Sequence, residues 1–285
     1  MSPELSQKLA AAVDGMPAFP KSVQKILELT RDVNCSPKDL VQVIDKDPVV
    51  TVKVLRVVNS AYYGLPKKIT SINHAVVYLG FNAIKNLSLS IAAIGMMHPN
   101  NAAGFKTQQY LAHSLVTASL AKQLALRVAG TDAMDCFIAG LLHDFGKVVI
   151  AQFMPREFRK ALEASQWHEI SLHLALQQVV GVDHAEVGSM LVEKWRFPSD
   201  LVDSIRHQYT PTRMDTPLMA CVYAAHQICK MRTPESAARP QPKELPAHII
   251  HRLGGTLSEL IQALGNATSV SKEAALLNLH TLSAI

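Results

Sequence analysis

A histidine and an aspartate stand side by side at the end of an apolar run, in Ala139-Gly140-Leu141-Leu142-His143-Asp144-Phe145-Gly146-Lys147. Burying an unpaired carboxylate in such a segment is costly, and a divalent metal is a common compensation. Imidazole and carboxylate together suit zinc, iron, manganese or nickel. The alternative is that Asp144 caps the helix that follows and that His143 is a hydrogen-bonded core residue. The doublet alone leaves both interpretations open.

The elements around the doublet are predicted to be helices. Apolar residues recur with a helical period along the whole chain, and no segment shows convincing period-2 alternation. We therefore predict an all-α fold in two helical lobes. The doublet follows a predicted helix over 132–142 and precedes an apolar run over 147–150. The other predicted helices cover residues 3–13, 21–33, a start at 36–39, 49–58, 72–79, 81–97, 106–128, 156–165, 168–180, 184–195, 198–207, 216–231, 247–253, 256–264 and 271–279.

Length and composition are those of a globular protein. The 285 residues are 48% hydrophobic and 18% charged, which suits one large or two modest domains. We see no apolar run near the roughly 20 residues of a membrane span, and no signal-peptide pattern at the N-terminus. Four cysteines without C-x-x-C spacing are typical of reduced thiols, so we expect a cytoplasmic protein without membrane partners.

Charge does not favour a nucleic-acid partner. The net charge is +5, but the lysines and arginines are scattered and form no basic stripe with interleaved aromatic residues.

Two loop-like stretches mark boundaries: His98-Pro99-Asn100-Asn101, and a segment with four prolines from Arg232 to Pro246. We expect three parts, at residues 1–100, 101–231 and 232–285.

Motifs in both predicted lobes resemble the HDOD family over roughly Phe19 to Tyr209. The matching motifs are Phe19-Pro20, Ile44-Asp45-Lys46-Asp47-Pro48, Val57-Val58-Asn59-Ser60-Ala61-Tyr62-Tyr63-Gly64, Ser71-Ile72-Asn73-His74-Ala75-Val76-Val77-Tyr78-Leu79-Gly80, the doublet segment, and Val182-Asp183-His184-Ala185-Glu186-Val187-Gly188. The family is a divergent relative of the HD-domain metal-dependent phosphohydrolases. The resemblance implies a bacterial signalling or regulatory module that often lacks demonstrable hydrolase activity. It also implies an HDOD-type lobe in 1–100 and an HD-like helical core in 101–231, with the last part packing on that core.

The resemblance also implies a set of metal ligands. These are His113 as the first ligand, the doublet His143 and Asp144, His184 and His207 at the additional two-metal positions, and His226 where the family pattern has a later aspartate. Gln208 stands where a second histidine is expected, and the Gly-Tyr-Pro element of cyclic di-GMP phosphodiesterases is missing. Lys147 matches a lysine that contacts phosphate in active relatives; alternatively, it is a helix-start lysine facing solvent.

These departures from the family pattern change how firmly the predicted site would hold metals. His226 in place of aspartate keeps a ligand but removes a negative charge, and Gln208 is a weak ligand, so a second metal would be held less firmly. One metal could still be held, with an open position for water or phosphate. Each histidine also has a plain structural interpretation, as a core residue for His113 and His226 or as part of a helix cap for His184.

Two functional hypotheses follow. The first is a regulatory signal-transduction protein that acts mainly by interaction with a protein partner, with a retained divalent metal (iron, zinc, manganese or nickel) and little or no hydrolase turnover. An exposed Tyr62-Tyr63 in the first lobe would suit a partner surface. The alternative is a metal-dependent phosphohydrolase or phosphodiesterase acting on a nucleotide or cyclic dinucleotide. The missing family elements favour the first hypothesis.

Overall fold

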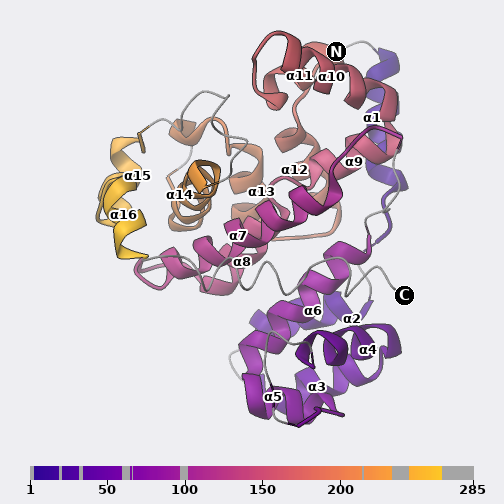
Figure 1. The fold of residues 1–285 in the computed structure, drawn as a ribbon, viewed down its shortest axis with the longest axis vertical. Coiled ribbons are helices and arrows are strands. Elements are labelled where there is room, and N and C mark those ends of the chain that lie inside the picture. The colour runs from indigo at the N-terminus through magenta and orange to yellow at the C-terminus, as the bar shows by residue number, and fades with distance from the viewer. Residues whose placement is uncertain are drawn as a thin grey trace. The chain divides into compact units, whose positions relative to one another are not determined.

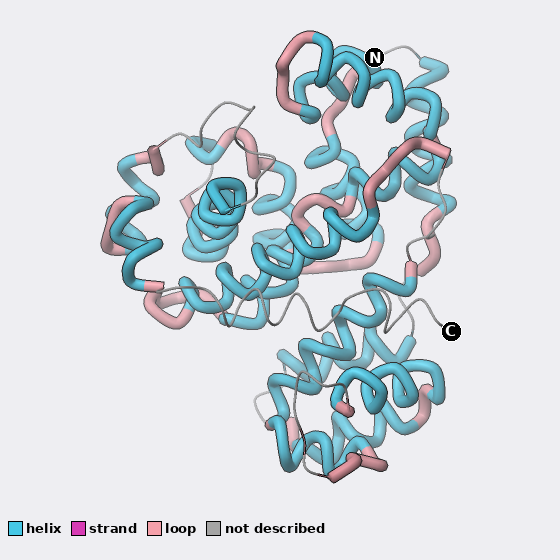
Figure 2. The backbone as a smooth tube through the Cα atoms, viewed as in Figure 1, coloured by secondary structure: helices cyan, strands magenta, loops and turns pink. Residues whose placement is uncertain are grey.

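Every regular element that the structure describes is a helix. The computed structural model describes residues 3–18, 21–31, 35–59, 65, 67–96, 102–213, 215–232 and 244–264. Within these ranges there is no strand (Figure 2), so the prediction of an all-α fold is confirmed. The Phe19-Pro20 motif, the Tyr62-Tyr63 pair and the helix predicted over 271–279 lie outside the described residues.

The chain forms two compact units. The small unit takes its described residues from Ala18–Met97, and the large unit takes its own from Met1–Pro17 and His98–Ser271. The small unit contains α2 (Lys21–Arg31), α3 (Pro37–Asp45), α4 (Pro48–Val58), α5 (Ile72–Leu79) and α6 (Phe81–Gly95). The large unit contains α1 (Pro3–Gly15), α7 (Thr107–Ala125), α8 (Ala133–Leu142), α9 (Gly146–Phe153), α10 (Pro155–Trp167), α11 (Leu172–Val180), α12 (His184–Lys194), α13 (Ser199–Arg206), a 3₁₀ turn at Pro211–Arg213, α14 (Pro217–Arg232), α15 (Ala247–Leu253) and α16 (Leu257–Ala263) (Figure 1).

Helix α1 belongs to the large unit, whereas the sequence analysis placed residues 1–17 with the first lobe. The helix packs on α9 and α12 and buries Leu9, Ala12 and Val13. The last turn of α1 is also tied to α12, since Lys194 Nζ donates to the Val13 carbonyl at 2.9 Å. The sequence of an amphipathic helix shows that one of its faces is buried, but not in which unit. Here the contacts with α9 and α12 place α1 in the large unit. At the other end of the unit, α15 and α16 both pack on α14.

Side-chain caps start many of the helices, as their sequences predict. Ser36 and Asp39 form a capping box at α3. The Asp47 carboxylate accepts the Val50 N–H at 3.1 Å to start α4, and the Ser71 hydroxyl accepts the His74 N–H at 3.2 Å to start α5. Each cap satisfies a backbone donor that has no partner inside the helix, which fixes where the helix begins.

Two glycines allow the helices around the doublet to approach closely. A Cβ on Gly140 of α8 would lie 2.7 Å from the Ala118 Cα of α7. A Cβ on Gly146, the first residue of α9, would lie 1.9 Å from the His184 carbonyl oxygen of α12. Neither distance is possible for a real side chain, so both contacts require glycine. As a result α7, α8, α9 and α12 converge on the residues between α8 and α9.

One apolar stretch, Ala133–Phe153, is long and apolar enough to cross a membrane by length and composition, with a mean hydropathy of 1.4. The sequence analysis saw no stretch of that length. In the structure 83% of its most apolar window is buried inside the protein. Its apolar side chains therefore fill the core of the large unit, between α7 and α14 on one side and α12 on the other.

Candidate metal centre

Three imidazoles and one carboxylate converge in the large unit. His113 comes from α7, His143 and Asp144 follow α8, and His226 comes from α14. One ligand atom from each residue lies within 4.8 Å of all the others, so the group could hold a metal ion. The imidazole ring centroids lie 4.5 to 5.3 Å apart. These four residues, named below the four-ligand group, bring together α7, the end of α8 and the distant α14.

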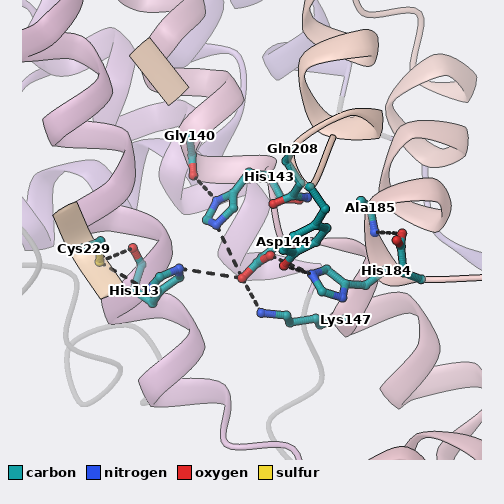
Figure 3. Close-up of polar contacts among 11 residues, drawn as sticks. His113, Gly140, His143, Asp144, Lys147, His184, Ala185, Gln208 and Cys229 are labelled. Carbon is teal, nitrogen blue, oxygen red and sulfur yellow. Dashed lines mark hydrogen bonds and ion pairs between the residues drawn. The ribbon is translucent and has the colours of Figure 1, made fainter. Parts of the chain in front are cut away.

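The hydrogen bonds of two imidazoles leave the same ring atom free. His143 Nδ1 donates to the Gly140 carbonyl at 2.7 Å (Figure 3). His113 Nδ1 lies 3.2 Å from Cys229 Sγ, whose thiol donates to the His113 carbonyl at 3.7 Å, so the sulfur can accept the Nδ1–H. In both rings Nε2 is buried and has no hydrogen-bond partner.

Both unpartnered Nε2 atoms lie near the same carboxylate oxygen. Asp144 Oδ2 is 3.4 Å from His143 Nε2 and 3.7 Å from His113 Nε2. Buried polar atoms normally have partners, and metal-binding histidines usually donate their other ring N–H to a neighbouring acceptor. The donor set of the four-ligand group therefore fits a divalent metal.

Burial sets the charge of these groups. It lowers the pKa of His113 to about 3 and that of His226 well below the ordinary value, so both rings are neutral near pH 7. Burial alone would raise the pKa of Asp144, but His143, Lys147 and His184 outweigh it and hold that pKa well below the usual range. Neutral imidazoles around an ionised carboxylate are the protonation states in which these side chains bind metals.

His184 holds the opposite oxygen of the carboxylate. Its Nε2 lies 3.0 Å from Asp144 Oδ1, and the Tyr209 hydroxyl lies 2.9 Å from the same nitrogen. The preceding Asp183 provides the helix cap, since its carboxylate accepts the N–H groups of Ala185 and Glu186. His184 is thus not in the four-ligand group but contacts it through Asp144, and the capping role belongs to Asp183.

Lys147 and Gln208 complete the surroundings of the doublet. The Lys147 ammonium forms an ion pair with Asp144 Oδ2, the oxygen that faces the imidazoles (Figure 3). Its side chain is 20% exposed and points at the group rather than away from it. Gln208 Nε2 donates to the His143 carbonyl at 2.7 Å, so this residue supports the backbone of the doublet from the turn after α13.

His207 lies outside the four-ligand group. It caps the C-terminal end of α13, where its N–H bonds to the Asp203 carbonyl, and its side chain is half-buried. Its two successors reach the doublet and the neighbouring His184 instead. Gln208 and Tyr209 bond to His143 and His184, and the Tyr209 ring stacks on His173 of α11 with centroids 3.9 Å apart.

Sequence reasoning missed three residues around the group: Cys229, Tyr209 and His173. The spacing of His226 and Cys229, three apart on α14, places both on one helix face, and this was the available signal for Cys229. No spacing signal exists for Tyr209 and His173, because their contact joins α11 to the turn after α13, which are separate in the sequence.

The chain matches one family model and several known proteins. The family model of the HDOD domain matches residues 16–211. An uncharacterized protein of Treponema pallidum is 26% identical over 247 residues, which are 85% of this chain and 47% of that protein. Ribonuclease Y of Thermus thermophilus is 30% identical over 150 residues, which are 53% of this chain and 20% of the enzyme. The chain thus spans about half or less of the length of these relatives.

Solved structures share the fold over most of the chain. An HDOD domain protein of unknown function from Geobacter sulfurreducens has a TM-score of 0.77 at 23% identity and covers 97% of both chains. A candidate phosphohydrolase from Shewanella amazonensis has a TM-score of 0.72 at 25% identity, over 95% of this chain and 98% of that one. A candidate signal transduction protein from Marinobacter aquaeolei has a TM-score of 0.80 at 21% identity, over 98% of this chain and 66% of that one.

Proposed function

This chain belongs to the HDOD family, and from that premise we propose that it is a cytoplasmic bacterial signal-transduction protein that acts mainly through interaction with a protein partner. In this proposal the four-ligand group holds one divalent metal, which is iron, zinc, manganese or nickel, with little or no hydrolase turnover. The likeness of the fold to a candidate signal transduction protein agrees with the regulatory role.

The observation that carries the proposal is the charge of the four-ligand group. Among the residues that the structure describes, this group contains one carboxylate, Asp144, and three imidazoles, which can contribute no negative charge. Asp144 is fully buried and already paired with Lys147. A second dication would add charge that no further carboxylate of the group offsets, and an unpaired buried charge is strongly unfavourable. Two-metal phosphoester hydrolysis, in which paired ions clamp both reacting oxygens, is therefore poorly supported here.

The chain's own residues would have distinct roles around a bound metal. His113, His143, Asp144 and His226 would hold it, and the metal would supply Lewis acidity and a bound water of lowered pKa. His184 orients Asp144 by holding the oxygen that faces away from the imidazoles. Gln208 fixes the peptide of His143, and Cys229 fixes the tautomer of His113. Most of this machinery positions ligands, which suits a structural or sensory metal.

One observation favours the alternative, a metal-dependent phosphohydrolase or phosphodiesterase acting on a nucleotide or cyclic dinucleotide. The Lys147 ammonium lies beside the four-ligand group and is partly exposed, so it could bind a phosphate oxygen once a metal neutralised Asp144. The fold is also shared with a candidate phosphohydrolase. The two functions differ in one measurable property, which is turnover.

The test combines metal content with phosphate release. Protein purified without added metal or chelator would be analysed by elemental mass spectrometry and assayed against nucleoside phosphates and cyclic dinucleotides, with iron and with manganese. Asp144→Asn is the test variant, and Asp200→Asn, an exposed position on α13, is the matched control. We expect metal that is lost only in Asp144→Asn, and no phosphate release above that variant. Release by the wild type that disappears in a folded Asp144→Asn protein would reject the proposal in favour of the hydrolase.

A further inference from the structure

The small unit carries the positive charge of the protein. Residues 18–97 contain 10 lysines and arginines and 5 aspartates and glutamates, whereas the whole chain contains 28 and 23. The net charge of this segment is thus +5, equal to that of the whole chain, and the remaining residues balance to zero. A segment with such an excess attracts acidic partners and repels basic ones.

Several acidic side chains of the small unit are engaged within it. The Asp39 carboxylate accepts bonds from Ser36 in the capping box of α3. The Asp47 carboxylate caps α4 and accepts the Ser22 hydroxyl at 2.6 Å. Glu28 pairs with Lys25 at 2.8 Å. These acids are therefore less available to an incoming protein than the exposed lysines.

Large apolar side chains are exposed on two helices of the same unit. On α4 Val49 is 60% exposed and Val52 is 52% exposed; on α5 Val77 is 78% exposed and Tyr78 is 58% exposed. Helices α4 and α5 pack on each other, and their opposite sides are buried in the core of the unit. We call these four side chains the α4/α5 face. Among the described residues of the large unit, no helix exposes two large apolar side chains, whereas α4 and α5 expose two each.

The Asn59 side chain holds the backbone directly after two lysines close to the end of α4. The Asn59 amide accepts the Ile69 N–H at 2.7 Å and donates to the Ile69 carbonyl at 2.7 Å. It also donates to the Leu55 carbonyl at 2.7 Å, within the last turn of α4. The exposed Lys67 and Lys68 come directly before this clamped residue. They are therefore fixed near the end of α4 and the start of α5.

We propose that the α4/α5 face binds an acidic amphipathic helix of a partner protein. The apolar stripe of that helix would cover the valines and Tyr78, and its glutamates or aspartates would face Lys67 and Lys68. Helix binding of this kind uses apolar anchors for affinity and surrounding charge for orientation and rate. A nucleic acid would use the lysines but would gain little from three exposed valines. The inference rests on the proposed function and names the surface and the chemistry of the partner.

The test uses a synthetic helical peptide with leucines on one face and glutamates on the other, and the full-length protein. A peptide of the same composition in scrambled order, a single-stranded RNA and anionic vesicles are the comparison ligands. The test variant is Val52→Asp combined with Val77→Asp, and Leu126→Asp in the large unit, where the leucine is 74% exposed, is the matched control. All three positions are exposed, so circular dichroism should show unchanged folding.

We expect fluorescence anisotropy to show that the wild type binds the amphipathic peptide, more weakly as salt rises, and does not bind the scrambled peptide. The double variant should lose at least about tenfold in affinity, whereas Leu126→Asp should lose nothing. No binding of the amphipathic peptide, equal binding by the double variant, or binding of RNA or vesicles alone would overturn the inference. A failure of this inference can be told apart from a failure of the proposed function, because the latter is tested by comparing phosphate release by the wild type and by Asp144→Asn.

Discussion

His184 Nε2 lies 3.0 Å from Asp144 Oδ1, while the other oxygen of the same carboxylate faces His113, His143 and Lys147. Helix α12 therefore anchors one side of the carboxylate and leaves the other side to the imidazoles. Because His184 approaches through the contact of α12 with Gly146, the geometry of Asp144 depends on helix packing as much as on its own neighbours. Substitutions that touch none of the four ligand residues can therefore test the geometry of the four-ligand group.

Replacing Gly146 with alanine should separate α9 from α12. A Cβ there would lie 1.9 Å from the His184 carbonyl oxygen, and the obstacle is backbone that cannot rotate away. We expect a loss of about 3 kcal/mol in the free energy of unfolding, as for severe overpacking, together with lower metal content. Urea unfolding measures the first effect. The control is Gly95→Ala in α6, where the nearest atom to a Cβ is Lys53 Nζ at 3.9 Å, and it should be no less stable than the wild type. A wild-type transition for Gly146→Ala would show that the contact is looser than described.

Replacing Asp144 with asparagine should remove the metal and destabilise the metal-free protein. The carboxylate is fully buried, and its loss leaves the Lys147 ammonium without its partner. Removing one member of a buried pair costs about 3 kcal/mol or more, less here because Lys147 is partly exposed. Elemental mass spectrometry and chemical denaturation in the presence of a chelator measure the two effects. Metal content equal to that of the wild type would show that the ion is bound elsewhere.

Acid should destabilise the metal-free protein in a range set by its buried histidines. Burial lowers the pKa of His113 to about 3, and burial also lowers that of His226. In the unfolded chain these rings titrate near about 6.5, so below that pH the unfolded state binds more protons and folding is disfavoured. Each ring should cost about 1.4 kcal/mol per pH unit as the pH falls from about 6.5 toward the folded-state value.

The slope of stability against pH checks this prediction. Urea unfolding with a chelator between neutral pH and mild acid should show a steep decrease for the wild type. His226→Gln should reduce the slope by about one proton, since one buried ring no longer titrates. A slope unchanged by His226→Gln would mean that this ring is already protonated in the folded protein.

Local features of the fold were predictable from sequence, and long-range ones were not. Caps such as Ser36, Asp47 and Asp183 act within one helical turn, so the residue types alone predicted where α3, α4 and α12 begin. The unit to which α1 belongs depends on contacts with α9 and α12, which no local pattern encodes. Lys147 had two interpretations from sequence, and its ion pair with Asp144 favours the one in which it faces the group.

The end of α13 shows why the ligand set was only partly predictable. The resemblance pointed to His207, but the chain leaves the helix there; Gln208 is the residue that bonds to the doublet, and Tyr209 bonds to His184. Successive residues of a helix differ by about 100° in direction, so a motif aligned to within one residue can still name a side chain that points elsewhere. His113 and His226 lie within helices, His143 and Asp144 directly follow one, and the structure brings these four together.

Replacing Lys147 with methionine should strengthen metal binding. The ammonium pairs with Asp144 Oδ2, the oxygen nearest the unpartnered Nε2 atoms, so a dication must displace it or bind beside a like charge. Methionine keeps much of the apolar stem and removes the charge, and we expect metal affinity to rise by about tenfold, the effect of removing roughly 1.4 kcal/mol of like-charge repulsion. Competition with a chromogenic chelator measures the affinity. Lys160→Met on the exposed side of α10 is the control and should leave affinity unchanged. If Lys147→Met instead bound metal more weakly than the wild type, the lysine would be holding Asp144 in its binding position rather than competing for it.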